Sequence, residues 1–250
     1  MKEIIIFFFL HWNLSLLCQS FFHHRFAAHR MFSMSDGMQK VFYWLTFIFQ
    51  GSSYLNVRTY AIMHRMHHAY ADTEKDPHSP LFSKNLFDMM WKTHNYFRDL
   101  KNGKKDIEER FKQNLPVVWR FGKYADSLPA RILWGSLYTA FYVYFAPSLW
   151  YFLLLPIHFL MGLFHGSIIN WFAHKYGDVS FTLENTSKNL PLIFFPLRML
   201  GEGEHNDHHN KPGNPNFAYN HERWYRFDPT YQVIKILNYF GVIQIKKVPS

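Results

Sequence analysis

The stretches His64-Arg65-Met66-His67-His68 and His205-Asn206-Asp207-His208-His209 organise this chain, and each has the pattern His-x-x-His-His. On a helix, residues at i, i+3 and i+4 share one face, so three imidazoles can point toward one place. Neutral imidazole is the commonest metal ligand in proteins. The chain holds 16 histidines, and two copies of one triplet so far apart in sequence predict a metal site.

Two further pairs of residues extend this pattern. Asn170 and His174 are four residues apart and therefore share a helix face, which makes Asn170 a candidate to hold a metal-bound water. His24 and His29 are five residues apart, roughly 140° from sharing a face of an α-helix. These two histidines therefore either serve different metals or lie where the helix ends.

Together these histidines are too many for one tetrahedral zinc ion, which needs four ligands. They suit two metals with five or six positions each, and imidazole alone does not say which metal is bound. Acidic residues near the triplets are candidates to orient the ring N–H groups: Asp72, Asp76, Glu202, Glu204 and Asp207. The candidate ligands are His24, His29, His64, His67, His68, His174, His205, His208 and His209.

The other histidines have weaker claims to a metal. His23 is expected to be a neighbour of the site. His158 and His165 are seven apart on one apolar helix and are expected to pack against neighbouring helices or to line a cavity. The histidines without clustered spacing are expected to lie outside the metal site: His11, His78, His94 and His221.

The composition of the 250 residues indicates a single membrane-associated domain, residues 1–250. Aromatic residues make up 20%, including 27 Phe, which is typical of side chains at a bilayer interface. The net charge of +9 indicates a positive cytoplasmic face, or a surface for an acidic partner or a phosphate-bearing substrate. The single cysteine, Cys18, excludes an internal disulfide and a thiolate cluster. No nucleic-acid partner is expected.

Three apolar runs, residues 4–22, 132–150 and 151–172, have the length of membrane spans. The first also resembles a signal peptide, but no A-x-A-like cleavage site follows it, so we expect an anchor. The other two are expected to form a hairpin that turns near Pro147-Ser148, away from the histidines.

Residues 41–57 are apolar and aromatic, but the histidines before and after them must lie on one side of the bilayer to meet. One crossing would separate the two groups, and the stretch is too short for two. We therefore predict an interfacial or partly buried helix there, a cytosolic loop with short helices at 69–130, and a cytosolic segment at 175–250. That last segment includes an amphipathic helix within residues 224–243.

The predicted fold class is an all-α integral membrane protein with about three transmembrane helices. Interfacial amphipathic helices would lie under a cytosolic helical cap that holds a histidine-rich dimetal site. The active site would lie on the cytoplasmic face.

In order and spacing, these motifs resemble the membrane fatty acyl desaturases, most closely the stearoyl-CoA (Δ9) branch. The stretch HRMHHAYADTEKDPHSP, residues 64–80, resembles the second histidine box of that branch. The stretch GEGEHNDHHNKPGNPNFA, residues 201–218, resembles its third. With His24-x4-His29 and Asn170-x3-His174, the resemblance covers residues 20 to 220.

The resemblance implies an oxidoreductase that uses O2 and two electrons to introduce a cis double bond, at Δ9 in that branch, into a long saturated acyl chain. Two non-haem iron ions (Fe²⁺) would be held by the nine candidate histidines, with Asn170 acting through water. Residues 60–63 do not match the Arg-Asp pair that precedes this box in the animal enzymes, so both acyl-CoA and acyl-lipid substrates remain open. Those enzymes also carry an additional apolar helix before the first box, so we expect three crossings rather than four.

The sequence contains no dinucleotide-binding G-x-G-x-x-G and no haem-binding His-Pro-Gly-Gly. An external electron donor, ferredoxin or a cytochrome b5-like protein, is therefore expected, and the basic stretch Lys101–Lys123 is a candidate docking face. A related membrane di-iron hydroxylase would use the same ligands. A non-catalytic membrane metal-binding protein or transporter would instead spread its metal sites through the depth of the bilayer.

Overall fold

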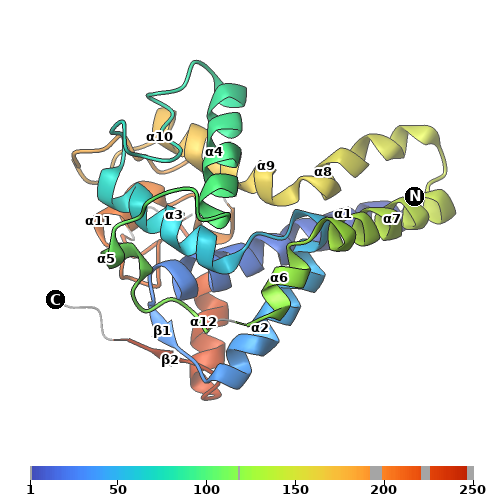
Figure 1. Cartoon of the computed structure of the whole chain (residues 1–250), viewed down its shortest axis with the longest axis horizontal. Coiled ribbons are helices and arrows are strands. Elements are labelled where there is room, and N and C mark those ends of the chain that lie inside the picture. Colours follow the sequence, from blue (N-terminus) through green and yellow to red (C-terminus); the bar gives the residue numbers. More distant parts are fainter. Residues whose placement is uncertain (1, 118, 192–198, 221–225, 247–250) are drawn as a thin grey trace.

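The computed structural model describes residues 2–117, 119–191, 199–220 and 226–246. Over these residues the chain is helical, and its only strands are β1 (Phe32–Ser33) and β2 (Gln244–Ile245), which pair antiparallel. Figure 1 shows a long arm on one side and a broader body that holds the other elements.

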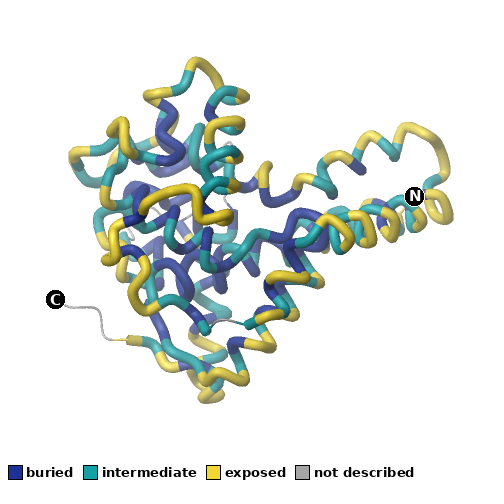
Figure 2. The backbone as a smooth tube through the Cα atoms, in the orientation of Figure 1, coloured by how far each residue is buried: buried dark blue, intermediate teal, exposed yellow. Residues whose placement is uncertain are grey.

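The arm consists of α1 (Lys2–Cys18), α7 (Leu128–Phe145) and α8 (Leu155–Phe159), which contact one another. The turn η3 (Leu149–Leu154) joins α7 to α8 at the end of the arm remote from the body, which confirms the predicted hairpin (Figure 1). Buried residues are concentrated in the body, whereas many arm residues are exposed (Figure 2). Such exposed apolar surface is typical of a segment that lies in a bilayer. The exposed apolar side chains of the arm include Ile6, Phe9, Leu133, Val143, Leu149 and Leu153.

Among the described residues, one continuous helix, Lys2–Ala28, is long and apolar enough to cross a bilayer. A second span requires joining Leu149–Phe159 to Met161–Lys175 across a bend of 69°. The helix α7, which covers most of the predicted span 132–150, carries Arg131 and several tyrosines and does not qualify. The third crossing therefore stays a prediction.

The body gathers the helices that carry the candidate ligands. The π-helix η1 (Gln19–Ala28) continues α1, and α3 (Val57–Tyr70) packs against it. The predicted loop at 69–130 contains a longer helix than expected, α4 (Leu86–Lys101), which packs on α3. The remaining elements are η2 (Gly51–Ser53), α5 (Glu109–Lys112), α6 (Phe121–Ala125), α9 (Met161–Ser167), η4 (Ile168–Phe172), α10 (Ala173–Lys175), η6 (Met199–Gly201), α11 (His205–Asn210) and α12 (Pro229–Tyr239).

Part of the stretch 41–57, predicted as an interfacial helix, is helical: α2 (Asp36–Gln50) begins five residues earlier, ends at Gln50 and packs against α1. Its exposed side chains Val41, Trp44 and Ile48 form an apolar stripe at helical spacing, a surface suited to a membrane interface. The chain turns back at Gly51, where φ is +51° and an added Cβ would collide with the hydroxyl of Tyr138. This glycine allows the turn that sends α3 back to the body.

Candidate metal centre

Histidines from four separate stretches of sequence converge in the body, where they form two neighbouring groups. Within each group, the candidate ligand atoms lie within 4.8 Å of one another. The prediction that these scattered clusters meet is therefore confirmed. The five-histidine group is His24, His29, His64, His68 and His208, and the four-histidine group is His67, His174, His205 and His209.

Each His-x-x-His-His triplet divides between the two groups. In α3, the i and i+4 residues His64 and His68 join the five-histidine group, whereas His67 joins the other. In α11, the i and i+4 pair joins the four-histidine group, whereas His208 joins the five-histidine group. Adjacent residues on an α-helix are about 100° apart, so one triplet reaches two sites. The expectation that a triplet points at one place is therefore wrong.

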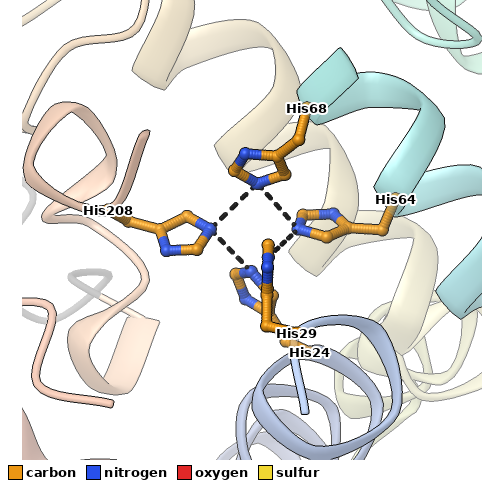
Figure 3. A group of neighbouring side chains, drawn as sticks. All are labelled: His24, His29, His64, His68 and His208. Atoms are coloured by element: carbon orange, nitrogen blue, oxygen red, sulfur yellow. Dashed lines mark hydrogen bonds between the residues drawn. The ribbon is translucent and has the colours of Figure 1, made fainter. Parts of the chain in front are cut away.

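The Nε2 atoms of the five-histidine group lie in contact in a chain (Figure 3). Each neutral imidazole carries one N–H, and a nitrogen that donates cannot also accept, so these contacts cannot all be hydrogen bonds. Ligands at right angles around a metal, each at about 2.1 Å, lie roughly 3 Å apart. The Nε2 separations are 3.0 Å for His24–His208, 3.0 Å for His208–His68, 3.1 Å for His68–His64 and 2.9 Å for His64–His29.

The four-histidine group has the same character. The Nε2 atoms of His205 and His174 are 3.0 Å apart, and those of His67 and His209 are 3.3 Å apart. Both spacings match neighbouring ligands of a single metal ion. The donor set and its geometry thus fit two metal ions, one in each group.

The π-helix η1 explains how His24 and His29 reach one group. The main-chain N–H of His29 donates to the carbonyl oxygen of His24 at 3.1 Å, an i to i+5 hydrogen bond, so the two residues stack one turn apart. His29 also terminates η1. The sequence left two alternatives for this pair, binding to different metals or a position where the helix ends. The structure favours the second. Arg65 of α3 donates to the carbonyl oxygens of Ala27 and Ala28 at 3.0 and 2.7 Å, which holds this end in place.

Three of the five predicted acidic residues contact a histidine ring. Each contact is to Nδ1, so a proton held there leaves the Nε2 lone pair facing the group. The other two, Glu204 and Asp207, lie 3.5 and 3.0 Å from the guanidinium of Arg226. The ring contacts are Glu202 to His24 at 2.5 Å, Asp76 to His67 at 3.0 Å and Asp72 to His174 at 3.4 Å.

The surroundings keep six of the nine imidazoles neutral. Burial lowers the pKa of these six well below the ordinary histidine value, and neighbouring histidines lower it further. Burial alone would raise the pKa of Asp76, but the hydrogen bonds that its carboxylate accepts from the His67 ring and from the main-chain N–H groups of Asp72 and His78 lower it. Neutral imidazoles and ionised carboxylates are the forms that bind a divalent cation. The six histidines are His29, His64, His68, His205, His208 and His209.

A cavity of about 130 Å³ adjoins both groups. It is lined by His24 and His64 of the five-histidine group and by His205 of the four-histidine group. Leu16 and Asn170 line it as well. A mostly apolar cavity that begins at candidate metal ligands has the polarity to hold a hydrocarbon chain.

His78 lies outside both histidine groups, as expected, but it is closer to them than the sequence indicates: with His67 and Asp76 it forms a third set of candidate ligand atoms. Its buried ring lies 4.3 Å from the ring of His67, and it lines the cavity. Burial and the neighbouring His67 lower the pKa of His78 to about 3. The available signal was its position two residues after Asp76, whose carboxylate accepts from both the His67 ring and the His78 main-chain N–H.

The other histidines are placed outside the two groups. His23 donates to the Leu55 carbonyl oxygen at 2.9 Å and is a neighbour, as predicted. His158 packs against His11 in the arm, and His165 lines the cavity, which confirms both expectations. His221 lies outside the described residues.

Fold and site together define a helical, histidine-rich protein in which two candidate metal positions adjoin a cavity for an apolar chain. The family model for fatty acid desaturases matches residues 4–235, and the chain belongs to this family. The family is membrane-associated and generally di-iron dependent, and its members are oxidoreductases of lipid metabolism. The resemblance inferred from the histidine motifs is confirmed.

Curated relatives support the same family. Acyl-CoA 5-desaturase AL21 of Anemone leveillei is 29% identical to this chain, and the matched region covers 91% of this chain and 66% of the relative. A probable acyl-CoA desaturase of Schizosaccharomyces pombe is 28% identical, covering 88% of this chain and 44% of its own. Delta-9 acyl-lipid desaturase 1 of Arabidopsis thaliana is 25% identical to this chain, and the matched region covers 91% of this chain and 70% of the relative. The chain thus spans less than two thirds of the length of the first two.

Proposed function

We propose that this chain is an O2-dependent fatty acyl desaturase that introduces a cis double bond, at Δ9, into a long saturated acyl chain. The observation that carries the proposal is the convergence of nine histidines into two groups, three members of which line an apolar cavity. When bound there, two non-haem iron ions would supply the oxidation, with O2 and two electrons, that removes two hydrogens from adjacent methylenes.

The residues divide the work of holding these ions. The five-histidine group would bind one ion, and the four-histidine group would bind the other with Asn170 acting through a water. Glu202, Asp76 and Asp72 would keep the Nδ1 protons of their histidines in place and so aim the Nε2 lone pairs. Such outer contacts typically change metal affinity by about 10- to 100-fold.

The cavity would select the carbon pair that reacts. Its walls are mostly apolar, so an acyl chain would displace water from it and lie against the histidines that line it. A chain held in one extended position brings a fixed pair of methylenes to the site, which is the main contribution of positioning to catalysis.

The substrate would be a long-chain acyl-CoA or acyl-lipid, because relatives named for each class match this chain. Electrons would come from an external ferredoxin or cytochrome b5-like donor on the cytoplasmic side. The basic stretch Lys101–Lys123 is the proposed docking face. Arg65 of α3 donates to the carbonyl oxygens of Phe111 and Gln113 in this stretch, which places it beside the helix that carries three of the histidines.

A membrane di-iron hydroxylase is the second candidate, because the same histidine set supports oxygen insertion, and its product would be an alcohol. A metal transporter is disfavoured, because the nine histidines gather in one place instead of spreading along the arm.

The test is expression in a host that supplies an electron donor, followed by profiling of fatty-acid methyl esters. We expect a new unsaturated product from the wild type and none from His208→Ala. An unchanged profile from iron-loaded, donor-supplied wild type would refute the desaturase proposal, and a hydroxylated product would favour the second candidate.

A further inference from the structure

The segment 186–190 follows α10 in the chain and supplies none of the candidate ligands. The main-chain N–H of Lys188 donates at 2.7 Å to the carbonyl oxygen of the residue before His174. At Thr186, the main-chain N–H and the hydroxyl both donate to Oδ2 of Asp72, at 2.6 and 2.7 Å. The same hydroxyl oxygen lies 3.3 Å from Nδ1 of His174. The segment is therefore tied both to α10 and to the turn that follows α3.

Asn189, in the same segment, caps the start of α11. The first main-chain N–H groups of a helix have no partner within the helix. Oδ1 of Asn189 accepts from those of Asn206 and Asp207 at 3.0 and 3.3 Å, and its Nδ2 donates to Oδ1 of Asp207 at 2.8 Å. Main-chain bridges join this buried residue to Asp178 and to Glu204. One amide side chain thus fixes where α11 begins, and with it the histidines of that helix.

The turn after α3 extends these connections to His67. The main-chain N–H of Asp72 donates to Oδ2 of Asp76 at 2.9 Å, and Asp76 lies 3.0 Å from the ring of His67. The segment 186–190 is therefore linked to every element that supplies the four-histidine group. These ligands are His67 on α3, His174 on α10, and His205 and His209 on α11.

We propose that Asn189 and Thr186 position the four-histidine group, so that disrupting them releases the metal ion of this group and leaves the other ion bound. This inference rests on the two-metal centre of the proposed function. A shift of α11 would displace two of the four ligands, and a loosened Thr186 would affect a third, His174.

The five-histidine group depends less on this segment. Only one of its five ligands, His208, lies on α11, and the others lie on α3 or at the end of η1. That end of η1 is held by Arg65, whose contacts do not involve the segment 186–190. Four ligands are enough to hold a metal ion, so a displaced His208 still leaves a binding site.

Two substitutions test the segment in different ways. Asn189→Ala removes the cap of α11, whereas Thr186→Val keeps a branched side chain and removes only its hydroxyl. Outer contacts of this kind typically change metal affinity by about 10- to 100-fold. We expect Asn189→Ala to weaken binding of one of the two ions by this factor, and Thr186→Val to weaken the same ion to a smaller extent. Asn102→Ala, at an exposed position, is the matched control and should bind both ions as the wild type does.

The measurement is titration of iron-free, full-length protein in detergent micelles with Co²⁺, a divalent ion of similar ligand preference. Visible absorption follows each ion as it binds. His205→Ala and His64→Ala, which each remove one ligand, identify the absorption of the four-histidine and the five-histidine group. Asn189→Ala should lose the component that His205→Ala loses and keep the component that His64→Ala loses. A change of overall stability alone would not select one component.

Binding of both ions by Asn189→Ala with wild-type affinity would overturn the inference, as would equal weakening of both ions. If Asn189→Ala does not fold, the titration of Thr186→Val decides by the same two criteria. A wild type that binds fewer than two ions would overturn the inference together with the two-metal centre. Because the titration needs neither an acyl chain nor O2, its result is independent of whether the protein desaturates a substrate.

Discussion

Arg25 donates from Nη1 to one oxygen of Glu202 at 2.7 Å, while the other oxygen of that carboxylate accepts from His24 Nδ1 at 2.5 Å. One carboxylate therefore links a fully buried cation to the five-histidine group. The same guanidinium donates to Asp228 at 2.7 Å and lies 3.6 Å from the ring centre of Phe217. Because buried charges are tolerated only when they are paired, the first histidine stretch depends on both C-terminal acids for its position.

Replacing Glu202 with glutamine should therefore weaken both the metal site and the fold. A glutamine amide has one acceptor oxygen in place of two, so it cannot accept from both His24 and Arg25, and this should lower iron affinity by about 10- to 100-fold. Arg25 loses one of two buried carboxylates, which should cost about 3 kcal/mol of unfolding free energy. Iron content per chain and denaturant unfolding measure the two effects. The control is Glu109→Gln, because that carboxylate is exposed. Wild-type iron content in Glu202→Gln would contradict the proposed role.

Arg65→Met should loosen the end of the π-helix. The guanidinium donates to four main-chain carbonyl oxygens, and a hydrogen bond to a charged group contributes about 1.5–3 kcal/mol. We expect unfolding free energy to fall by about 2 kcal/mol or more, together with iron loss, and Arg65→Lys to recover only part of it. Arg98→Met, at an exposed position, should have little effect. Equal stability of Arg65→Met and Arg98→Met would show that the four hydrogen bonds from Arg65 do not stabilise the fold. The four acceptors belong to Ala27, Ala28, Phe111 and Gln113.

The sequence predicts the histidine groups well where they depend on α-helical spacing, as in α3 and α11. It does not predict the division of each triplet, because this depends on the rotation of the helix relative to its partners. The sequence also does not predict that His24 and His29 join one group. Residues five apart share a face on a π-helix but not on an α-helix, and the sequence pattern was read with the α-helical period. His78 escaped notice because its contact with His67 is made by a turn, not by a helix face.

The arm contains a chain of hydrogen bonds that should stabilise it independently of the metal site. Nδ1 of His11 lies 2.6 Å from Nδ1 of His158, whose Nε2 contacts the Tyr142 hydroxyl at 2.8 Å. Such bonds between membrane helices contribute roughly 1–2 kcal/mol. His158→Leu should lower stability in micelles by about this amount with iron content retained. The double variant His11→Phe/His158→Leu should cost less than the sum of the single changes, because it leaves no imidazole without its partner. Iron loss in His158→Leu would contradict this prediction, because it would show that the metal centre depends on the hydrogen bonds of the arm.

The iron-free protein should become less stable as the pH falls. Burial lowers the pKa of histidines such as His68 and His208 in the folded chain, whereas the unfolded chain keeps a value near 6.5. The unfolded state therefore binds more protons below about pH 6.5, and stability present above this pH is lost below it, by up to about 1.4 kcal/mol per pH unit for each such group. Urea unfolding at several pH values measures this slope. His208→Phe should reduce it and His94→Gln, at an exposed position, should not. Stability that rises on acidification would contradict this account.

Charge reversal in the basic stretch tests the proposed docking of the electron donor. Lys104 and Lys105 are exposed in the segment that Arg65 holds against α3. Because complementary charge mainly accelerates encounter, Lys104→Glu/Lys105→Glu should slow donor-dependent turnover by about tenfold at low ionic strength, and less at high salt. Lys235→Glu, exposed on α12, is the matched control. Turnover driven by a small chemical reductant should be unaffected, since it needs no docking surface. An equal loss with both reductants would assign these lysines to the site itself and remove this stretch as the docking face.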